Sequence, residues 1–494
     1  MDQHSARPSR PAALRIPPPL HFIDNQQVAP AGGQTIPVVD PSDGQVFAQL
    51  ARGNRDDIDR AVHAAERARD GAWGKLAPAD KGRLLMKLSR SILDHHEELA
   101  QLESADCGKP LKQARADVAA CARYFEFYAG APDKLHGDTI PYLSGYTVLT
   151  WREPHGVTGH IIPWNYPLQI FGRSVGGALA AGNACVVKPA EDACLSLLRV
   201  AELAAEVGFP PGVINIVTGY GPEAGMPLAE HPGIEHISFT GSPATGSIVA
   251  QAAAKRHCPV TLELGGKSPQ VVFADADLDA ALPVLVNAII QNAGQTCSAG
   301  SRLLVEKAAY ERVLDLLGQR FAALRTGPAQ ADLDCGPLIR ANQLERVKGF
   351  LADAASDRLP IAGQGQLVSD APAGGYYQPP TLVRDVPPAH RLANDEVFGP
   401  VLAAMPFTDE ADAIKLANGS PFGLATGIWT RDGGRQLRLA RAIRAGQVFV
   451  NTYGAGGGVE LPFGGMKHSG YGREKGFEAL FAFTTVKTVA IQHG

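Results

Sequence analysis

The sequence predicts an α/β protein with parallel β-sheets, divided into more than one domain. The chain has 494 residues, more than one ordinary hydrophobic core accommodates, so length alone suggests about two to four domains. From residue 158 on, short apolar runs alternate with helical stretches. The predicted strands are 159–163, 184–189, 212–217 and 236–240, and the predicted helices are 168–181 and 195–207. Strands that alternate with helices at such intervals predict a parallel sheet covered on its faces.

The N-terminal part is expected to support this sheet. Residues 1–20 contain five prolines and no apolar core of a signal peptide, so we expect a disordered tail. Residues 21–55 alternate apolar runs with turn formers, which predicts edge strands or hairpins. Helices near 56–70, 78–105 and 112–129 are expected to cover the sheet and to have no other role.

Two further units are predicted from the remaining segments. A strand at 301–307 and helices near 308–325 and 341–356 indicate a second α/β unit. Residues 139–153 are typical of a β-hairpin, and 484–492 alternate like a strand. Because an isolated hairpin is barely stable in water, these strands are expected to need a partner surface.

Composition is that of an ordinary soluble globular protein, with 45% hydrophobic and 19% charged residues. The net charge of −4 gives no reason to expect nucleic acid or an anionic membrane as a partner, and no apolar run is long enough to span a bilayer. The seven cysteines form no CxxC pair, and the histidines form no HExxH pair, so neither a disulfide framework nor a metal site is indicated. We therefore expect a cytoplasmic protein without a metal.

A carboxylate and a thiol stand out in the stretch 261–302. Glu263 lies between two leucines in an apolar strand, where loss of water favours the neutral form of a carboxylic acid. Cys297 lies among small residues that a substrate can reach, and its thiolate is a strong nucleophile. Covalent catalysis needs one group that attacks carbon and another that activates the water releasing the product. The alternatives are an inert buried cysteine and a structural ion pair of Glu263.

Seven motifs, in one order along the chain, make it similar to a known family. They are PWNYP, GNACVVKP, FTGS, LELGGKSP, GQTC, EVFGP and PFGGMKHSGYGRE. From about residue 20 to the C-terminus the chain resembles the aldehyde dehydrogenase superfamily, in its NAD(P)-dependent, non-acylating branch. The resemblance implies a Rossmann-like cofactor domain with a parallel sheet, a second α/β catalytic domain and a small β domain for oligomerisation.

The resemblance also implies where these domains lie. The NAD-binding domain would comprise 21–131 and 155–262, and the catalytic domain 263–465. The oligomerisation hairpin and tail would be 132–154 and 480–494, and in the family equivalent segments pair across subunits. A homodimer or a homotetramer is therefore expected.

Catalytic roles follow from the same resemblance. Cys297 would add to an aldehyde as a thiohemiacetal and then carry a thioester, and Glu263 would activate the water that hydrolyses it. The Asn165 amide, together with the Cys297 backbone N–H, would stabilise the oxyanion, where the loss of one donor typically costs about 3 kcal/mol. Lys188 completes the catalytic set. Family members that pass the acyl group to coenzyme A lack the glutamate, so Glu263 implies hydrolysis to a free acid. An asparagine that only fixes its own turn is the alternative for Asn165.

The cofactor is predicted from small-residue turns and one acidic residue. The sequence GxGxxxG from Gly219 is a weak signal, whereas FTGS before an alanine-rich helix is a better one, because helix N-termini bind phosphate. Glu191 would accept hydrogen bonds from ribose hydroxyls and repel a 2′-phosphate, which favours NAD and makes NADP the less expected cofactor. The predicted cofactor-binding residues are Ile161, Pro163, Trp164, Lys188, Glu191, Gly221, Gly225, Phe239, Thr240, Gly241, Ser242, Leu264, Gly265, Glu396 and Phe398.

The substrate is an aldehyde whose class depends on one arginine. Arg173 lies about two helical turns after Tyr166, so it should face the same mouth and repel a cationic aldehyde. Succinate-semialdehyde dehydrogenases carry an arginine here, but Gly457 and Gly458 stand where they have a serine that assists in carboxylate binding. A helix-surface ion pair is the alternative for Arg173. The predicted substrate residues are Tyr166, Arg173, Thr296, Ser298, Gly457 and Phe463.

We therefore expect an aromatic or long-chain aldehyde first and a succinate-semialdehyde-type substrate second. A cofactor-free esterase would be a different activity of the same thiol, and Lys188, Glu191 and FTGS argue against it as the main role. A non-catalytic structural descendant of the family is the remaining alternative. Such a descendant would tolerate loss of Cys297, Glu263 or Asn165, yet all three are present.

Overall fold

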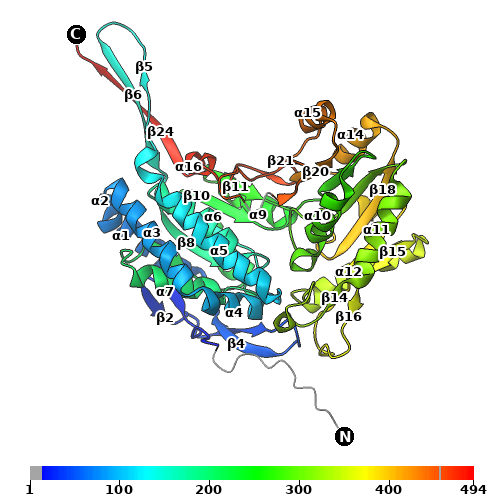
Figure 1. Cartoon of the computed structure of the whole chain (residues 1–494). Helices are drawn as coiled ribbons and strands as arrows, with labels where there is room; N and C mark the ends of the chain where they lie inside the picture. The colour runs from blue at the N-terminus through cyan, green and yellow to red at the C-terminus, as the bar shows by residue number, and fades with distance from the viewer. Residues whose placement is uncertain (1–13, 455–457) are drawn as a thin grey trace.

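The protein, a computed structural model that describes residues 14–454 and 458–494, has the predicted α/β fold class. Two large sheets with helices packed against them form the body, and a smaller sheet projects from it (Figure 1). The extent of each domain given above stays a prediction. Of the predicted tail, residues 14–20 are described: Pro17 is buried, and Arg15 forms ion pairs with Glu98 and Glu202 at 3.9 and 3.5 Å. The chain is thus packed against the body from this point on.

The first sheet has the strand order β2-β1-β9-β8-β7-β10-β11-β23. Its strands are β1 (His21–Ile23), β2 (Gln26–Val28), β7 (Val157–Ile162), β8 (Ala184–Pro189), β9 (Ile214–Ile216), β10 (His236–Thr240), β11 (Val260–Glu263) and β23 (Gly470–Tyr471). The central strands, in the order β9-β8-β7-β10-β11, are parallel to one another, as predicted. The strands at both edges pair antiparallel with their neighbours. Strand order reverses at β7, and ligands of such sheets bind beyond the carboxyl ends of the strands at this switch point.

Helices cover both faces of the first sheet. They are α1 (Arg55–Asp70), α2 (Ala72–Lys75), α3 (Pro78–Asp94), α4 (His96–Cys107), α5 (Leu111–Ala129), α6 (Pro167–Ala180), α7 (Leu195–Glu206), α8 (Met226–Glu230) and α9 (Pro243–Ala254). The single helix predicted for 78–105 is two helices, because His95 leaves helical geometry at φ −107° and ψ 24°. The hairpin of β3 (Thr35–Val39) and β4 (Val46–Ala51) agrees with the prediction for 21–55.

The second sheet has the order β15-β17-β18-β13-β12-β20-β21, parallel except for the edge strand β15. Its strands are β12 (Pro269–Val272), β13 (Arg302–Glu306), β15 (Ile361–Gln364), β17 (Thr381–Val383), β18 (Val401–Phe407), β20 (Ala425–Trp429) and β21 (Gln447–Val450). Its main helices are α10 (Leu278–Ile290), α11 (Tyr310–Ala323), α12 (Ala341–Ser356), α13 (Arg391–Asn394), α14 (Glu410–Asn418) and α15 (Gly433–Ala442).

Alternate side chains of the second sheet enter two separate cores. Val271 and Leu304 pack in one hydrophobic cluster with residues of α12 and α14, whereas Val272 and Leu303 pack in another with residues of α10 and α11. Because neighbouring side chains of a strand point to opposite faces, both faces of this sheet are buried. That is the arrangement expected of a parallel sheet and explains the continuous apolar runs in these strands.

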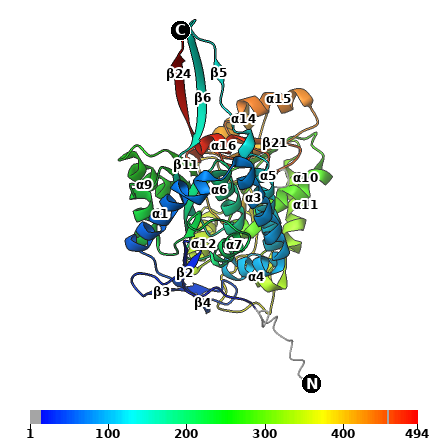
Figure 2. The same cartoon turned by 90° about the vertical axis from the view of Figure 1, so that its left-hand side faces the viewer.

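The small sheet projects from the body of the molecule (Figures 1 and 2). It consists of β5 (Thr139–Ile140), β6 (Tyr146–Pro154) and β24 (Thr484–Gln492), in the order β24-β6-β5. Strand β24 pairs antiparallel with β6 along its whole length, from Thr484 opposite Pro154 to Gln492 opposite Tyr146. The predicted hairpin and C-terminal strand are thus parts of one sheet within the chain. Among the described residues, every helix is too short or too polar to cross a membrane.

Candidate active site

A cavity of about 500 Å³ lies at the carboxyl ends of β7, β10 and β11, facing the second α/β unit. It brings together Cys297, Glu263 and Asn165, three of the four residues predicted to be catalytic, whereas the fourth, Lys188, is not in its wall. The predicted cofactor-binding residues in its wall are Pro163, Trp164, Thr240, Gly241, Ser242, Gly265, Glu396 and Phe398. Segments more than two hundred residues apart therefore share one cavity.

Cys297 is presented by a strained loop at the end of α10. Asn292, Ala293 and Gly294 all have left-handed backbone conformations, with φ values of 48°, 53° and 73°. Such a conformation is unfavourable for a residue with a side chain and persists only where its surroundings impose it, often at functional sites. Cys297 is half-buried and lines the cavity, yet the surrounding protein removes enough water to raise the pKa of its thiol to about 12. The free thiol therefore needs a proton acceptor or a nearby positive charge to become a thiolate at neutral pH.

Glu263 is the last residue of β11 and reaches the cavity from the first sheet. Its side chain is 1% exposed, and neither carboxyl oxygen has a hydrogen-bond partner. Burial raises the pKa of this carboxyl well above its ordinary value of 4.5, so the neutral form is favoured, as its leucine neighbours predicted. A side chain at Gly266 would come within 2.2 Å of the Cys297 carbonyl oxygen. The glycine pair after Glu263 thus lets the two catalytic segments approach each other closely.

Asn165 follows β7 and is held from two sides. Its side-chain Nδ2 donates a hydrogen bond to the Gln295 carbonyl oxygen at 2.9 Å, and its own carbonyl oxygen accepts one from Asn292 Nδ2 at 2.8 Å. The side chain is 5% exposed and lines the cavity. An amide nitrogen carries two hydrogens, so one remains for an oxygen atom in the cavity beside Cys297.

The cofactor side of the cavity combines small turns with fixed aromatic rings. Phe398 has a left-handed backbone, φ 55°. Its ring centroid lies 5.3 Å from that of Trp164, and the two rings are nearly perpendicular. Glu396 accepts a hydrogen bond from the Gly266 N–H at 2.8 Å, and burial raises the pKa of its carboxyl to about 7. A side chain at Gly265 would lie 2.3 Å from Glu396. The cavity has the volume of a small-molecule site, about 500 Å³, and its wall includes Ser242 at the N-terminus of α9, a helix end of the kind that binds phosphate.

The remaining predicted cofactor residues do not line this cavity. Lys188 and Glu191 form an ion pair at 3.2 Å, and Gly225 packs beside Lys188. Phe239 and Leu264 are buried, Ile161 is half-buried in β7, and Gly221 begins a single π-helical turn beside open space. In the described part of the chain, no three His, Cys, Asp or Glu side chains are grouped so as to hold a metal ion.

Comparison with known proteins agrees with this geometry. The model of the aldehyde dehydrogenase family matches residues 28–489. The chain belongs to this family.

Relatives of this aldehyde dehydrogenase act on different aldehydes. It is 41% identical to hydroxyisobutyraldehyde dehydrogenase of Mycolicibacterium austroafricanum, over 96% of this chain and 94% of the relative. It is also 41% identical to the mitochondrial benzaldehyde dehydrogenase of Antirrhinum majus, over 95% and 88%. A crystal structure from Burkholderia cenocepacia, of a protein classed with the aldehyde dehydrogenases, has a TM-score of 0.96 and 70% identity, over 96% of this chain and all of that one. The NAD⁺ complex of the Bacillus cereus enzyme has a TM-score of 0.94 and 39% identity, over 97% of both chains.

The structure places Arg173 differently from the prediction. Its Nε donates to Glu474 Oε2 at 2.5 Å, its Nη2 donates to Thr240 Oγ1 at 3.1 Å, and its guanidinium lies over the Phe463 ring at 4.8 Å. The residue is 7% exposed and is not in the cavity wall. Helical spacing predicted that Arg173 faces the same mouth as Tyr166, but α6 is buried almost all round, so an inward position on it is not by itself a substrate position. The role of Arg173 toward a substrate stays a prediction.

Three of the other predicted substrate residues, Tyr166, Thr296 and Ser298, lie in or beside the Cys297 loop. Tyr166 and Thr296 share a hydrogen bond between their hydroxyls at 2.8 Å, and the Ser298 carbonyl accepts one from Tyr453 at 2.6 Å. Phe463 is buried. Gly457 lies outside the described residues.

Several residues of the site were missed by sequence reasoning. Gln343 and Arg346 on α12 donate to the backbone carbonyls of Phe398 and Glu396, at 2.7 and 2.6 Å, and so fix the loop that carries them. Glu474 was included only as the end of a motif, although it pairs with Arg173. The helix α12 itself was predicted with its bounds, but its spacing alone does not show which element it contacts.

Proposed function

We propose that this enzyme oxidises an aldehyde to the carboxylic acid with NAD, through covalent catalysis by Cys297. The observation that carries the proposal is the single cavity that Cys297, Glu263 and Asn165 share with the predicted cofactor residues. The Cys297 sulfur attacks the aldehyde carbon, forms a C–S bond and turns the carbonyl oxygen into an oxyanion. The free N–H of the Asn165 amide and the Cys297 backbone N–H donate to this oxyanion.

Glu263 then serves the second half of the reaction. When bound, NAD supplies the acceptor for the hydride that leaves the substrate carbon. Glu263 takes a proton from a water molecule, whose oxygen adds to the thioester carbon. The C–S bond breaks, the carboxylic acid leaves and Cys297 is restored. Burial raises the pKa of the Glu263 carboxyl well above 4.5, which makes its ionised form a stronger base than an exposed carboxylate.

NAD is proposed over NADP because of Glu191. Its carboxylate pairs with Lys188 at 3.2 Å, where the two together suit a ribose with free hydroxyls and oppose a 2′-phosphate. The NAD⁺ complex of the Bacillus cereus relative supports this choice. A yeast relative, 38% identical, is named as an NAD(P)⁺ enzyme, so the preference has to be measured on this chain. Initial rates with either cofactor at equal concentration test it.

For the substrate we propose a neutral aromatic or long-chain aldehyde. Arg173 is bound to Glu474, which balances its charge, so this arginine is not free to hold a substrate carboxylate. Tyr166 hydrogen-bonds to Thr296, the neighbour of Cys297, and gives aromatic surface near the thiol. The benzaldehyde dehydrogenase among the relatives supports this class. A panel of benzaldehyde, octanal and succinate semialdehyde, followed by NADH formation, tests it: a strong preference for succinate semialdehyde would reverse the order.

We further propose that the small sheet β24-β6-β5 joins the chain to a second copy. Both of its outer strands have free edges, and apolar side chains such as Trp151, Val486 and Ile491 are about half exposed on it. A homodimer or homotetramer would cover them. Deletion of residues 484–494 should lower the mass measured by light scattering, whereas an unchanged mass would place the interface elsewhere.

All seven cysteines are free thiols, which supports a reducing compartment such as the cytoplasm.

A further inference from the structure

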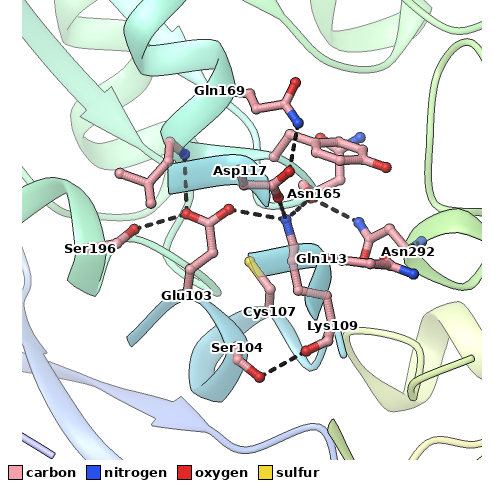
Figure 3. A network of polar contacts seen from close by, with 12 residues as sticks. Glu103, Ser104, Cys107, Lys109, Gln113, Asp117, Asn165, Gln169, Ser196 and Asn292 are labelled. Atoms are coloured by element: carbon pink, nitrogen blue, oxygen red, sulfur yellow. Dashed lines mark hydrogen bonds and ion pairs between the residues drawn. The ribbon is translucent and has the colours of Figure 1, made fainter. Parts of the chain in front are cut away.

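A buried ion cluster lies directly behind Asn165 (Figure 3). Lys109, in the turn between α4 and α5, is 1% exposed. Its ammonium donates to Glu103 at 3.0 Å, to Asp117 at 2.5 Å and to the backbone carbonyl of Asn165 at 3.0 Å. These three contacts match the three donors of an ammonium group. We call Lys109, Glu103 and Asp117 the positioning network.

The two carboxylates extend this contact to the helix that begins next to Asn165. Glu103 accepts hydrogen bonds from the Leu168 N–H at 3.3 Å and from Ser196 at 3.2 Å, and Asp117 accepts one from the Gln169 side chain at 2.5 Å. Leu168 and Gln169 belong to the first turn of α6. The network therefore holds the backbone at Asn165 itself and at the start of α6, which follows it directly.

The same carbonyl of Asn165 also connects to the nucleophile. Asn292 donates to it from its side chain at 2.8 Å, and the Asn292 N–H donates to Gln113 at 2.8 Å. Asn292 begins the left-handed segment that leads to Cys297. The backbone oxygen of Asn165 thus accepts one hydrogen bond from Lys109 and one from Asn292 of the Cys297 loop. It therefore links the two segments that carry the oxyanion donors.

Stability alone does not explain such a cluster. A buried ion pair loses so much hydration that apolar residues of the same volume often stabilise a fold equally well or better. A fully hydrogen-bonded network, however, holds its members in one geometry, because each displacement leaves a buried polar group without a partner. The benefit expected of the cluster is therefore geometric, and it falls on Asn165.

We propose that Lys109 is a positioning residue, which with Glu103 and Asp117 fixes the Asn165 backbone so that the Asn165 amide and the Cys297 N–H converge on one oxyanion. The inference rests on the proposed aldehyde oxidation. Since misplacement of a reacting group by about 1 Å can reduce a rate about 10²-fold, K109M should lower kcat by about 10- to 100-fold. The KM for the aldehyde and the affinity for NAD should change little, because Lys109 is buried outside the cavity wall.

A double-mutant cycle with N165A separates positioning from general stability. If Lys109 acts through Asn165, K109M should have almost no further effect on kcat in an N165A background, and additive losses would overturn the proposal. The matched control is R199M, which removes another buried cation, one on α7 that pairs with Glu98, Glu202 and Glu206. R199M should reduce stability and keep kcat per folded molecule.

A second variant covers the case in which K109M does not fold. N292G removes the other donor to the Asn165 carbonyl, and glycine adopts the left-handed backbone of this position without strain. It should lower kcat in the same direction by a smaller factor, and an unchanged kcat would overturn the proposal. Failure of the wild type to oxidise any aldehyde while Cys297 still reacts with iodoacetamide would instead refute the proposed function. K109M that keeps full kcat in an active enzyme refutes only the positioning role.

Discussion

Replacing Glu263 by glutamine tests the chemistry and the physical state of the buried carboxyl together. E263Q keeps the shape of the side chain and removes its ability to accept a proton. General base catalysis typically contributes about 10² to 10⁴ in rate, so steady-state turnover should fall by that factor, equivalent to about 2.7–5.4 kcal/mol in the barrier. If Glu263 acts on water, the first turnover should still release about one NADH per subunit before the rate falls. Loss of the first turnover too would assign Glu263 to the thiol.

The same variant makes a prediction about stability and pH. Burial raises the folded pKa of Glu263 above its ordinary value of 4.5, so from about pH 4.5 up to the folded pKa the unfolded chain has released this proton and the folded chain keeps it. Wild-type stability therefore falls with rising pH in this window because of this group. Glutamine does not titrate, and other buried carboxyls contribute equally to both proteins. The difference in unfolding free energy, E263Q minus wild type, should grow by up to about 1.4 kcal/mol per pH unit.

Urea unfolding at several pH values measures this difference, and iodoacetamide labelling of Cys297 confirms that the cavity of E263Q is intact. If the difference in unfolding free energy between E263Q and the wild type stays constant from about pH 5 to 9, the slope of about 1.4 kcal/mol per pH unit is absent. The Glu263 carboxyl is then not held neutral. Unchanged turnover would remove Glu263 from the mechanism.

Three further predictions concern other parts of the site. Burial raises the pKa of the Cys297 thiol to about 12. Its labelling by iodoacetamide without cofactor should therefore accelerate about tenfold per pH unit between about pH 7 and 9, with the half-buried Cys258 as the comparison. A plateau of the labelling rate in this range would contradict the raised pKa. E191S removes the charge that opposes a 2′-phosphate, so kcat/KM for NADP relative to NAD should rise at least about tenfold, and an unchanged ratio would place the discrimination elsewhere. R173M leaves Glu474 buried without its cation and should destabilise the fold by about 3–5 kcal/mol in urea unfolding. The double variant R173M/E474Q should recover most of this loss. Equal losses of stability in both variants would mean that the ion pair is not the cause.

Local sequence was enough to predict most of the fold. The apolar runs at β7, β8 and β10 and the helices between them follow from short-range periodicity, and their parallel pairing follows from the crossover lengths. The helix α12 was predicted with its observed bounds because its apolar spacing is regular. The break at His95 was missed, since nothing in a window of this size distinguishes one long helix from two consecutive ones.

The candidate site was predicted where a motif stands directly at a strand end. Glu263 ends β11, and Asn165 and Trp164 follow β7, so the switch point of the sheet brings them together. Lys109 gave no such signal, because a lysine between Gly108 and Pro110 in a helical connection is typical of an exposed turn. Its burial results from the packing of α4, α5 and α6 around it.

By itself the sequence determined the α/β class, the strand ends that carry the chemistry and the residue types available there, because each depends on apolar periodicity or on a short motif. Only the tertiary structure decided which charges are paired. Arg173 and Glu474 are 301 positions apart, and Lys109 and Asn165 are 56 apart, so their contacts depend on how whole elements pack and not on local preference. The physical reason is that a charge is free or neutralised according to what lies within a few ångströms in space, and that distance is set by the assembled core.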